Sequence, residues 1–239
     1  EGWLFGMKVT VLRNDRHVPP GHIERAVRSA GHELDLVRLG EGAALPAPSD
    51  LDAVIVLGGE MGAYDVEEFP YLTEEKIFLR QAVEIGVPVL GVCLGCQLLA
   101  DSLGGSAYLA AAPEVALGPL PTLVDDDVVG VLGTGPTLTI HRDTWDLPAG
   151  ATLIARSDRY NQAFRFGSAL GVQPHPEVDH EIVESWLSTD EGRRLAEGAG
   201  TEAQAVIQAF HLVEAEVREL ADRFFGEWLD EADRIRARR

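Results

Sequence analysis

Cysteine is scarce in this sequence, which contains only Cys93 and Cys96 among its 239 residues. Two thiols three positions apart are too few and too close together to serve as a disulfide framework. A chain of this length, 46% of it hydrophobic, can bury a core large enough to fold without one. We therefore expect reduced thiols and one sizeable domain, with or without an appendage.

Positive charge is also in short supply. Lys and Arg number 20 against 39 Asp and Glu, a formal net charge of −19. This excess repels phosphate backbones and anionic lipid surfaces, so neither nucleic acid nor a membrane is expected as a partner. The stretch RIRARR at residues 234–239 is an exception. It is either a small basic patch or the solvated end of a helix whose dipole it complements.

Long apolar runs are absent as well. No stretch approaches the roughly 20 apolar residues that cross a bilayer, and no basic segment leads into an apolar stretch and a cleavage site at the start. We therefore predict a cytoplasmic protein. The opening EGWLFG precedes a strand-like segment, and residues 1–6 are interpreted as a disordered or expression-derived leader.

Strand-like and helical segments alternate through the first half of the chain. Continuous apolar runs at residues 53–57 and 87–92 are typical of strands buried on both faces, and helical patterns span residues 22–30 and 73–85. This alternation predicts a parallel α/β sheet. Shorter β-like runs between turn residues predict antiparallel additions to that sheet, at residues 137–141, 152–156 and 163–166.

A long amphipathic helix is predicted over residues 201–236. Its apolar side chains recur every three or four positions, at Val206, Phe210, Val213, Val217, Leu220 and Phe224. We expect this stripe to dock on the same domain; the alternative is that part of it forms a homo-oligomer interface. The predicted organisation is a main domain over residues 7–190 and a helical appendage over residues 191–239.

Cys93 lies between a buried strand and a helix, with Gly91 and Gly95 two residues away on either side. This pattern is typical of a nucleophile elbow, a sharp turn with little room for side chains near the nucleophile. The N-terminus of the following helix favours thiolate over thiol and offers free amides to a developing oxyanion. Cys93 is therefore a candidate nucleophile.

Two other interpretations of Cys93 are open. It could be a buried small hydrophobe, as most free cysteines are, or one half of a redox pair, because Cys93 and Cys96 have C-x-x-C spacing. The bracketing glycines, the polar Gln97 and a downstream His/Glu pair favour the nucleophile.

That pair is His175 and Glu177, in the segment GVQPHPEVD. Pro176 biases His175 to extended geometry, in which residues two apart point the same way. A carboxylate beside an imidazole fixes its tautomer and supports the imidazolium formed when it accepts the thiol proton. An isolated His-x-Glu is usually structural, but combined with the elbow it predicts a base and its orienting group.

A second oxyanion donor is expected at Gly58-Gly59, which follow a buried strand. Because the carboxyl ends of parallel strands line one edge of a sheet, the amides of Gly59 and Leu94 are predicted to converge on one carbonyl oxygen. The alternative is a simple turn built on two glycines.

Five segments taken together resemble the class I glutamine amidotransferases, most closely the stand-alone GMP-synthase-like group. They are LGG, GVCLGCQLLA, IHRDTWDLP, SDRYNQAFRFG and QPHPE, and the resemblance extends over roughly residues 8–184. It implies a flavodoxin-like, three-layer α/β fold and a Cys-His-Glu triad of Cys93, His175 and Glu177. It also implies an oxyanion hole at Gly59 and Leu94, and substrate contacts from Gly58, Gln97, His141, Arg142 and Asp143.

The sequence departs from that family at three positions that flank the expected pocket. Glu60 follows the double glycine where proline is common, Arg142 replaces the glycine of a His-Gly-Asp stretch, and Pro174 stands where an aromatic residue is usual. These changes either reshape recognition of the glutamine α-amino and α-carboxylate groups, admit a larger γ-glutamyl substrate, or are neutral.

The activity implied is hydrolysis of the γ-amide of glutamine to glutamate, without metal or cofactor. Because the chain has no G-x-x-x-x-G-K-[ST] loop and no attached ATP-using domain, the ammonia is expected to pass to a partner synthase or acceptor substrate. Two alternatives stand beside it: a γ-glutamyl hydrolase that acts on a larger conjugate without a partner, and a non-catalytic binding protein on the same fold.

Overall fold

The computed structural model describes residues 6–239, so residues 1–5 of the expected leader lie outside the described residues. Seven strands form the main sheet in the order β2-β1-β3-β4-β9-β8-β7. Their bounds are β1 Lys8–Arg13, β2 Glu33–Arg38, β3 Ala53–Val56, β4 Val89–Val92, β7 Thr152–Arg156, β8 Asn161–Phe166 and β9 Ala169–Val172. The first five strands in the order pair in parallel, and β8 and β7 add antiparallel pairs. The predicted α/β sheet is confirmed.

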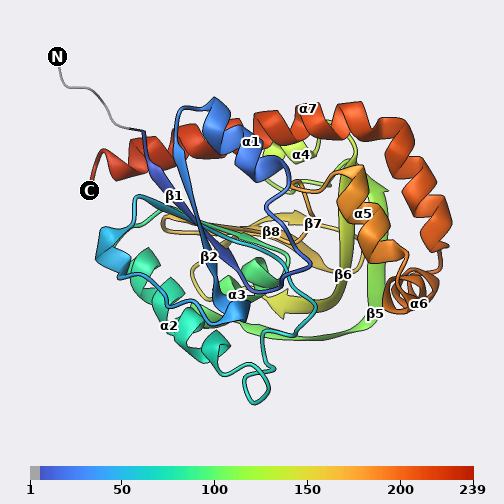
Figure 1. Cartoon of the computed structure of the whole chain (residues 1–239), viewed down its shortest axis with the longest axis horizontal. Helices are drawn as coiled ribbons and strands as arrows, with labels where there is room; N and C mark the ends of the chain where they lie inside the picture. The colour runs from blue at the N-terminus through green and yellow to red at the C-terminus, as the bar shows by residue number, and fades with distance from the viewer. Residues whose placement is uncertain (1–5) are drawn as a thin grey trace.

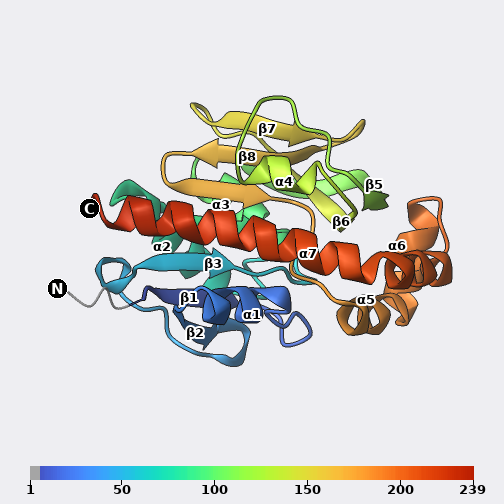
Figure 2. The ribbon, with the colours of Figure 1, turned by 90° about the horizontal axis from the view of Figure 1, so that it is seen from above.

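Helices cover both faces of this sheet (Figures 1 and 2). Helices α1 His22–Ser29, α4 Val129–Leu132 and α7 Ala203–Arg236 share one apolar core, and α2 Tyr71–Glu84 and α3 Leu94–Ser102 share another. Alternate residues of β3 serve the two cores: Ile55 packs in the first, and Val54 and Val56 in the second. This is why β3 reads as an unbroken apolar run. Two short 3₁₀ turns, at Leu39–Glu41 and Pro48–Asp50, interrupt the connection between β2 and β3.

A separate two-stranded antiparallel sheet is formed by β5 Ser106–Gly118 and β6 Thr137–Asp146. The prediction that residues 137–141 add to the main sheet is therefore wrong, whereas β7 and β8 are confirmed as additions. The β5–β6 register shifts between Leu109 and Glu114. The intervening residues 110–113, AAAP, have no alternating pattern, so the sequence did not reveal β5, the long strand that pairs with β6.

The C-terminal part contains α5 His180–Leu187, α6 Asp190–Gly198 and α7. Asp179 caps α5 by accepting a hydrogen bond from the Ile182 amide at 2.9 Å, and Thr189 caps α6 in the same way through Gly192. The predicted long helix is confirmed as α7, and most of its apolar stripe is buried within this chain.

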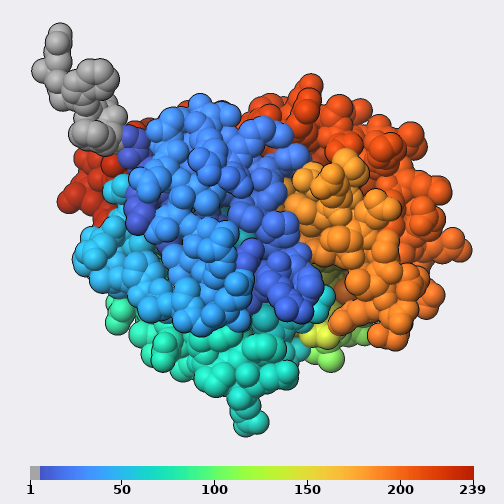
Figure 3. All heavy atoms as spheres, in the orientation of Figure 1, coloured from blue at the N-terminus to red at the C-terminus, as the bar shows by residue number. Residues whose placement is uncertain are grey.

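None of the helices between residues 6 and 239 combines the length and apolar character that a bilayer crossing requires. On the face shown in Figure 3, the orange segment that contains α5 lies directly against the blue segment that contains α1.

Candidate active site

Cys93 forms a sharp turn between β4, which ends at Val92, and α3, which begins at Leu94. Its φ is 52° and its ψ is −108°, and no other non-glycine residue between positions 6 and 239 has a positive φ. Such a conformation costs about 1–3 kcal/mol. The Cys93 amide donates to Val172 O at 2.9 Å, and Cys93 O accepts from the Gln97 amide at 3.1 Å. These bonds hold the elbow.

The two glycines beside Cys93 are required by packing. A Cβ on Gly91 would lie 2.5 Å from Gly95 O, and one on Gly95 would lie 2.8 Å from the Val56 Cβ and clash with the Val56 carbonyl. Any larger side chain at either position would push α3 away from the strands below it. The glycine spacing that suggested an elbow therefore has a direct steric cause.

His175 and Glu177 form a buried pair next to this elbow. His175 Nδ1 lies 2.7 Å from Glu177 Oε1, and the Glu177 side chain has no exposed area. An added Cβ on Gly58 would lie 3.3 Å from His175 Cε1 and 3.6 Å from Cys93 Cβ, so Gly58 adjoins both residues. Burial opposes a charge on His175, but Glu177 and Cys93 outweigh it and hold the pKa of His175 well above its usual value.

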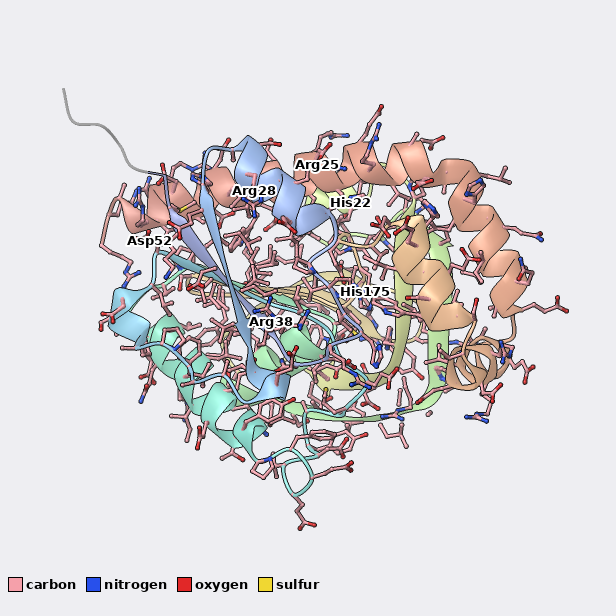
Figure 4. All side chains as sticks on the ribbon, in the orientation of Figure 1. His22, Arg25, Arg28, Arg38, Asp52 and His175 are labelled. Atoms are coloured by element: carbon pink, nitrogen blue, oxygen red, sulfur yellow. The ribbon has the colours of Figure 1, made fainter. Side chains whose placement is uncertain are left out.

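Trp186, on α5, forms one side of this site. Its ring packs edge-on against the His175 imidazole with 5.1 Å between ring centroids, and its Nε1–H donates to His17 O at 2.9 Å. Figure 4 shows His175 near the middle of the molecule, between the sheet and α5. Sequence reasoning missed Trp186, because the helical pattern of α5 does not reveal which face meets the histidine.

A cavity of about 130 Å³ opens over Cys93. This volume is well above the ~10–15 Å³ that admits a single water. Of the predicted residues, its lining contains Cys93, His175, Gly59, Gln97, His141, Arg142 and Asp143. Residues that were not predicted also line it, among them Asp15 before α1, Trp186 on α5, and Glu191 and Leu195 on α6.

The predicted oxyanion donors and substrate residues occupy different places around Cys93. Gly59 follows the end of β3 and lines the cavity, whereas Leu94 is the first residue of α3, directly after Cys93. The side-chain amide of Gln97 is held inside the protein, where its Nε2 donates to Asp143 O and to Gln173 Oε1 at 3.3 Å each. His141 is also bonded internally.

Arg142 contacts acidic and backbone groups at the rim of the cavity. Its guanidinium lies 3.4 Å from Glu60 O, 3.5 Å from Asp143 Oδ1 and 3.8 Å from Glu191 Oε1. Partial burial and the nearby charge of Asp15 raise the pKa of Glu60. Two of the three departures from the family pattern, Glu60 and Arg142, therefore meet at this rim.

Cys96, one turn along α3, faces away from the cavity. Its side chain is fully buried, and its sulfur packs so closely on Gly171 that an added Cβ there would lie 2.8 Å from it. Burial raises the pKa of the Cys96 thiol well above its usual value, and both cysteines are free. This geometry does not favour a redox pair. Among residues 6–239, no group of three or more His, Cys, Asp or Glu side chains is placed to hold a metal ion.

Residues 21–189 match the family model of class I glutamine amidotransferases. The chain belongs to the class I glutamine amidotransferase family. It is 28% identical to the glutamine amidotransferase-like protein YfeJ of Salmonella typhimurium, over 81% of this chain and 85% of that protein. It is 30% identical to one subunit of the glutamine-hydrolysing GMP synthase of Haloarcula marismortui, over 76% of this chain and 95% of that relative.

Larger relatives and solved structures agree with this assignment. The GMP synthase of Helicobacter acinonychis is 29% identical over 73% of this chain, which spans only 32% of that enzyme. A crystal structure of a glutamine amidotransferase from Thermotoga maritima superimposes with a TM-score of 0.82 at 26% identity, over 94% of this chain and 98% of that one. One from Methylobacillus flagellatus gives 0.83 at 25% identity, over 94% and 95%.

Proposed function

We propose that this chain hydrolyses the γ-carboxamide of glutamine to glutamate and ammonia, with Cys93 as nucleophile, His175 as base and Glu177 as the group that orients the base. One observation carries the proposal. A strained elbow directs a cysteine into a cavity beside a buried His–Glu pair joined at 2.7 Å. These are the parts that nucleophilic amide hydrolysis needs.

The proposed reaction begins when His175 takes the proton of Cys93 and the thiolate attacks the γ-carbonyl carbon. The carbonyl oxygen becomes an oxyanion, which the amides of Gly59 and Leu94 stabilise. The tetrahedral intermediate collapses, the C–N bond breaks, and ammonia leaves with the proton carried by His175. Water that His175 activates then hydrolyses the γ-glutamyl thioester, which releases glutamate and restores the Cys93 thiol.

A partner synthase is the proposed destination of the ammonia. The relative from Haloarcula marismortui, of which this chain covers 95%, is named as one subunit of a glutamine-hydrolysing GMP synthase. The chain spans about a third of three longer GMP synthases that it matches, at 32%, 31% and 33% of their lengths. These relatives support a glutaminase that works with a separate synthase protein.

A second candidate is a γ-glutamyl hydrolase that releases a larger amine and needs no partner. The observation in its favour is the rim of the cavity, which Glu60 and Arg142 both line and where the Arg142 guanidinium donates to the Glu60 backbone carbonyl at 3.4 Å. Charged groups at the rim can contact the part of a conjugate that extends beyond the γ-amide.

The test compares glutamate release from glutamine and from γ-glutamyl amides of larger amines, for the parent protein and for Cys93→Ala. We expect turnover of glutamine that Cys93→Ala abolishes and that Cys96→Ala leaves in place. Turnover of the larger amides alone would favour the second candidate. Unchanged turnover in Cys93→Ala contradicts the mechanism, and a folded protein inert toward every amide supports the non-catalytic alternative.

A further inference from the structure

His141 lines the substrate cavity, and each of its ring nitrogens lies beside an oxygen. Nδ1 is 2.8 Å from the carbonyl oxygen of Asp143, and Nε2 is 3.0 Å from Glu114 Oε2. The His141 side chain is 1% exposed and that of Glu114 is 13% exposed. Glu114 comes from β5, whereas His141 and Asp143 belong to β6. Neither nitrogen is left for solvent or for a substrate.

The hydrogen-bonding capacity of these oxygens determines the protons on His141. A carbonyl oxygen can only accept, so Nδ1 must carry a proton. Burial alone would raise the pKa of Glu114, but hydrogen bonds from His141, Ser157 and Gln162 outweigh it and lower that pKa, so Glu114 is a carboxylate. A carboxylate also only accepts, so Nε2 carries a proton too. Both hydrogen bonds can form together only when the His141 ring carries a proton on each nitrogen.

The Glu114–His141 pair connects to the nucleophile through the Asp143 carbonyl. That oxygen also accepts a hydrogen bond from Gln97 Nε2 at 3.3 Å. Gln97 lies on α3, one turn after Cys93, and its backbone amide donates to Cys93 O at 3.1 Å. Arg142 and Asp143, which follow His141, line the cavity, whereas Glu114 does not. The Glu114 carboxylate thus lies one residue removed from the cavity, behind the His141 that lines it.

Side chains from β8 and from the turn before it hold Glu114 and His141 in place. Gln162 Nε2, on β8, donates to Glu114 Oε2 at 2.6 Å. The Tyr160 ring packs edge-on against His141 with 5.6 Å between centroids, and its hydroxyl donates to Ala112 O on β5. The carboxylate therefore has a defined position as well as a charge.

We propose that Glu114 is a positioning residue of the active site, which holds His141 as an imidazolium and thereby fixes the Asp143 carbonyl and the Arg142–Asp143 segment against the substrate cavity. Its effect on turnover rests on the proposed glutamine hydrolysis. The protonation of His141 does not depend on that activity.

Two substitutions separate the charge of Glu114 from its shape. Glu114→Gln keeps the shape but removes the negative charge, so His141 should keep its Nδ1 proton, bonded to Asp143, and lose its Nε2 proton. Glu114→Ala removes both the charge and the hydrogen bond. Glu227→Gln, which changes an exposed carboxylate on α7, is the matched control.

The direct test is nitrogen-15 NMR of the histidine side chains at neutral pH, with the His141 signals assigned by their loss in His141→Asn. We expect two protonated ring nitrogens in the parent protein and in Glu227→Gln. We expect one protonated and one unprotonated nitrogen in Glu114→Gln. A neutral His141 ring in the parent protein, or an unchanged ring in Glu114→Gln, overturns the proposal.

Kinetics provide the second measurement. Loss of the hydrogen bond from His141 to Glu114 should raise KM for glutamine about tenfold in Glu114→Ala, with a smaller change in kcat, because the affected Arg142–Asp143 segment lines the cavity. Labelling of Cys93 by iodoacetamide should stay at the parent rate in both variants. An unchanged KM in a folded Glu114→Ala contradicts the positioning role. If the parent protein turns over no glutamine, the proposed function fails, and the NMR result still decides the state of His141.

Discussion

Cys93 directly precedes α3 and Cys96 lies in the first turn of that helix, yet their surroundings differ. Cys93 occupies a positive-φ elbow at the cavity, next to His175. Cys96 points into the core against Gly171, where burial raises the pKa of its thiol. The same residue type is therefore placed for chemistry at one position and for packing at the other. Only the geometry around each sulfur makes the difference.

Glu75 is a second buried ionisable residue, away from the cavity. It is fully buried on α2, accepts a hydrogen bond from Asn14 Nδ2 at 3.2 Å, and has a pKa raised by burial to about 8. The folded protein therefore binds one more proton than the unfolded chain between pH 4.5, the ordinary pKa of this group, and about 8. Stability should fall as pH rises through this window.

We predict that Glu75→Gln removes most of this pH dependence. The variant should be more stable than the parent near pH 8 by a few kcal/mol at most, and the two should converge near pH 5 (roughly 1.4 kcal/mol per unit of pKa shift). Urea unfolding at several pH values measures it. Glu74→Gln, at the exposed neighbouring position, should keep the parent slope, and an unchanged slope in Glu75→Gln would falsify the explanation.

At this scale the sequence revealed some residues and not others. Cys93 was recognisable because its glycines are local in sequence, and the His175–Glu177 pair because extended geometry aligns residues two apart. Their catalytic roles stay predictions. Trp186, Glu191 and Glu114 were not identified, because their positions depend on how α5, α6 and β5 pack against distant segments.

The junction of β3, β4 and α3 is the element that sets the elbow. Gly95 lies so close to Val56 that an added Cβ would clash with it, whereas nothing lies within 4 Å of a Cβ on Gly226 of α7. The same substitution should therefore have opposite effects at the two sites.

We predict that Gly95→Ala destabilises the protein by about 1–3 kcal/mol through overpacking and lowers turnover because the start of α3 moves. Gly226→Ala should stabilise it by about 0.5–1 kcal/mol through helix propensity, with turnover unchanged. Denaturant unfolding and a glutaminase assay measure both effects. Equal destabilisation in the two variants would show that the close contact with Val56 is not the cause.

The strands and helices differed in how far the sequence revealed them. Buried parallel strands and the helices between them follow from local patterns, so β3, β4, α1 and α2 were placed within a few residues. The β5–β6 pair was not, because an irregular register and the AAAP segment erase the alternating signal of β5.

On the scale of the whole molecule, α7 completes the core of the domain. Phe224 and Phe225 of α7 pack in one cluster with Val9 and Val11 of β1 and with Ile23 of α1. Figure 2 shows α7 crossing this face of the sheet from end to end. The apolar stripe that suggested a homo-oligomer interface is mostly occupied within the chain, and a homo-oligomer stays a prediction without that support.

We predict that Phe224→Ala lowers the free energy of unfolding by about 3–5 kcal/mol, because it leaves a large cavity beneath α7. Leu212→Ala, on the same helix but with 83% of its residue surface exposed, should change it by no more than about 0.5 kcal/mol. Urea unfolding followed by circular dichroism tests both. A small loss in Phe224→Ala would mean that α7 docks without contributing to the core.

The most direct test of the account is covalent labelling by an electrophilic glutamine analogue, followed by peptide mapping with mass spectrometry. Cys93 is predicted to take one equivalent of label in step with the loss of glutaminase activity, and Cys96 is predicted to take none while the protein is folded. Labelling should disappear in Cys93→Ala and be protected by glutamine. Labelling at another residue, or glutamine turnover that survives complete modification of Cys93, would contradict the assignment of Cys93 as the nucleophile.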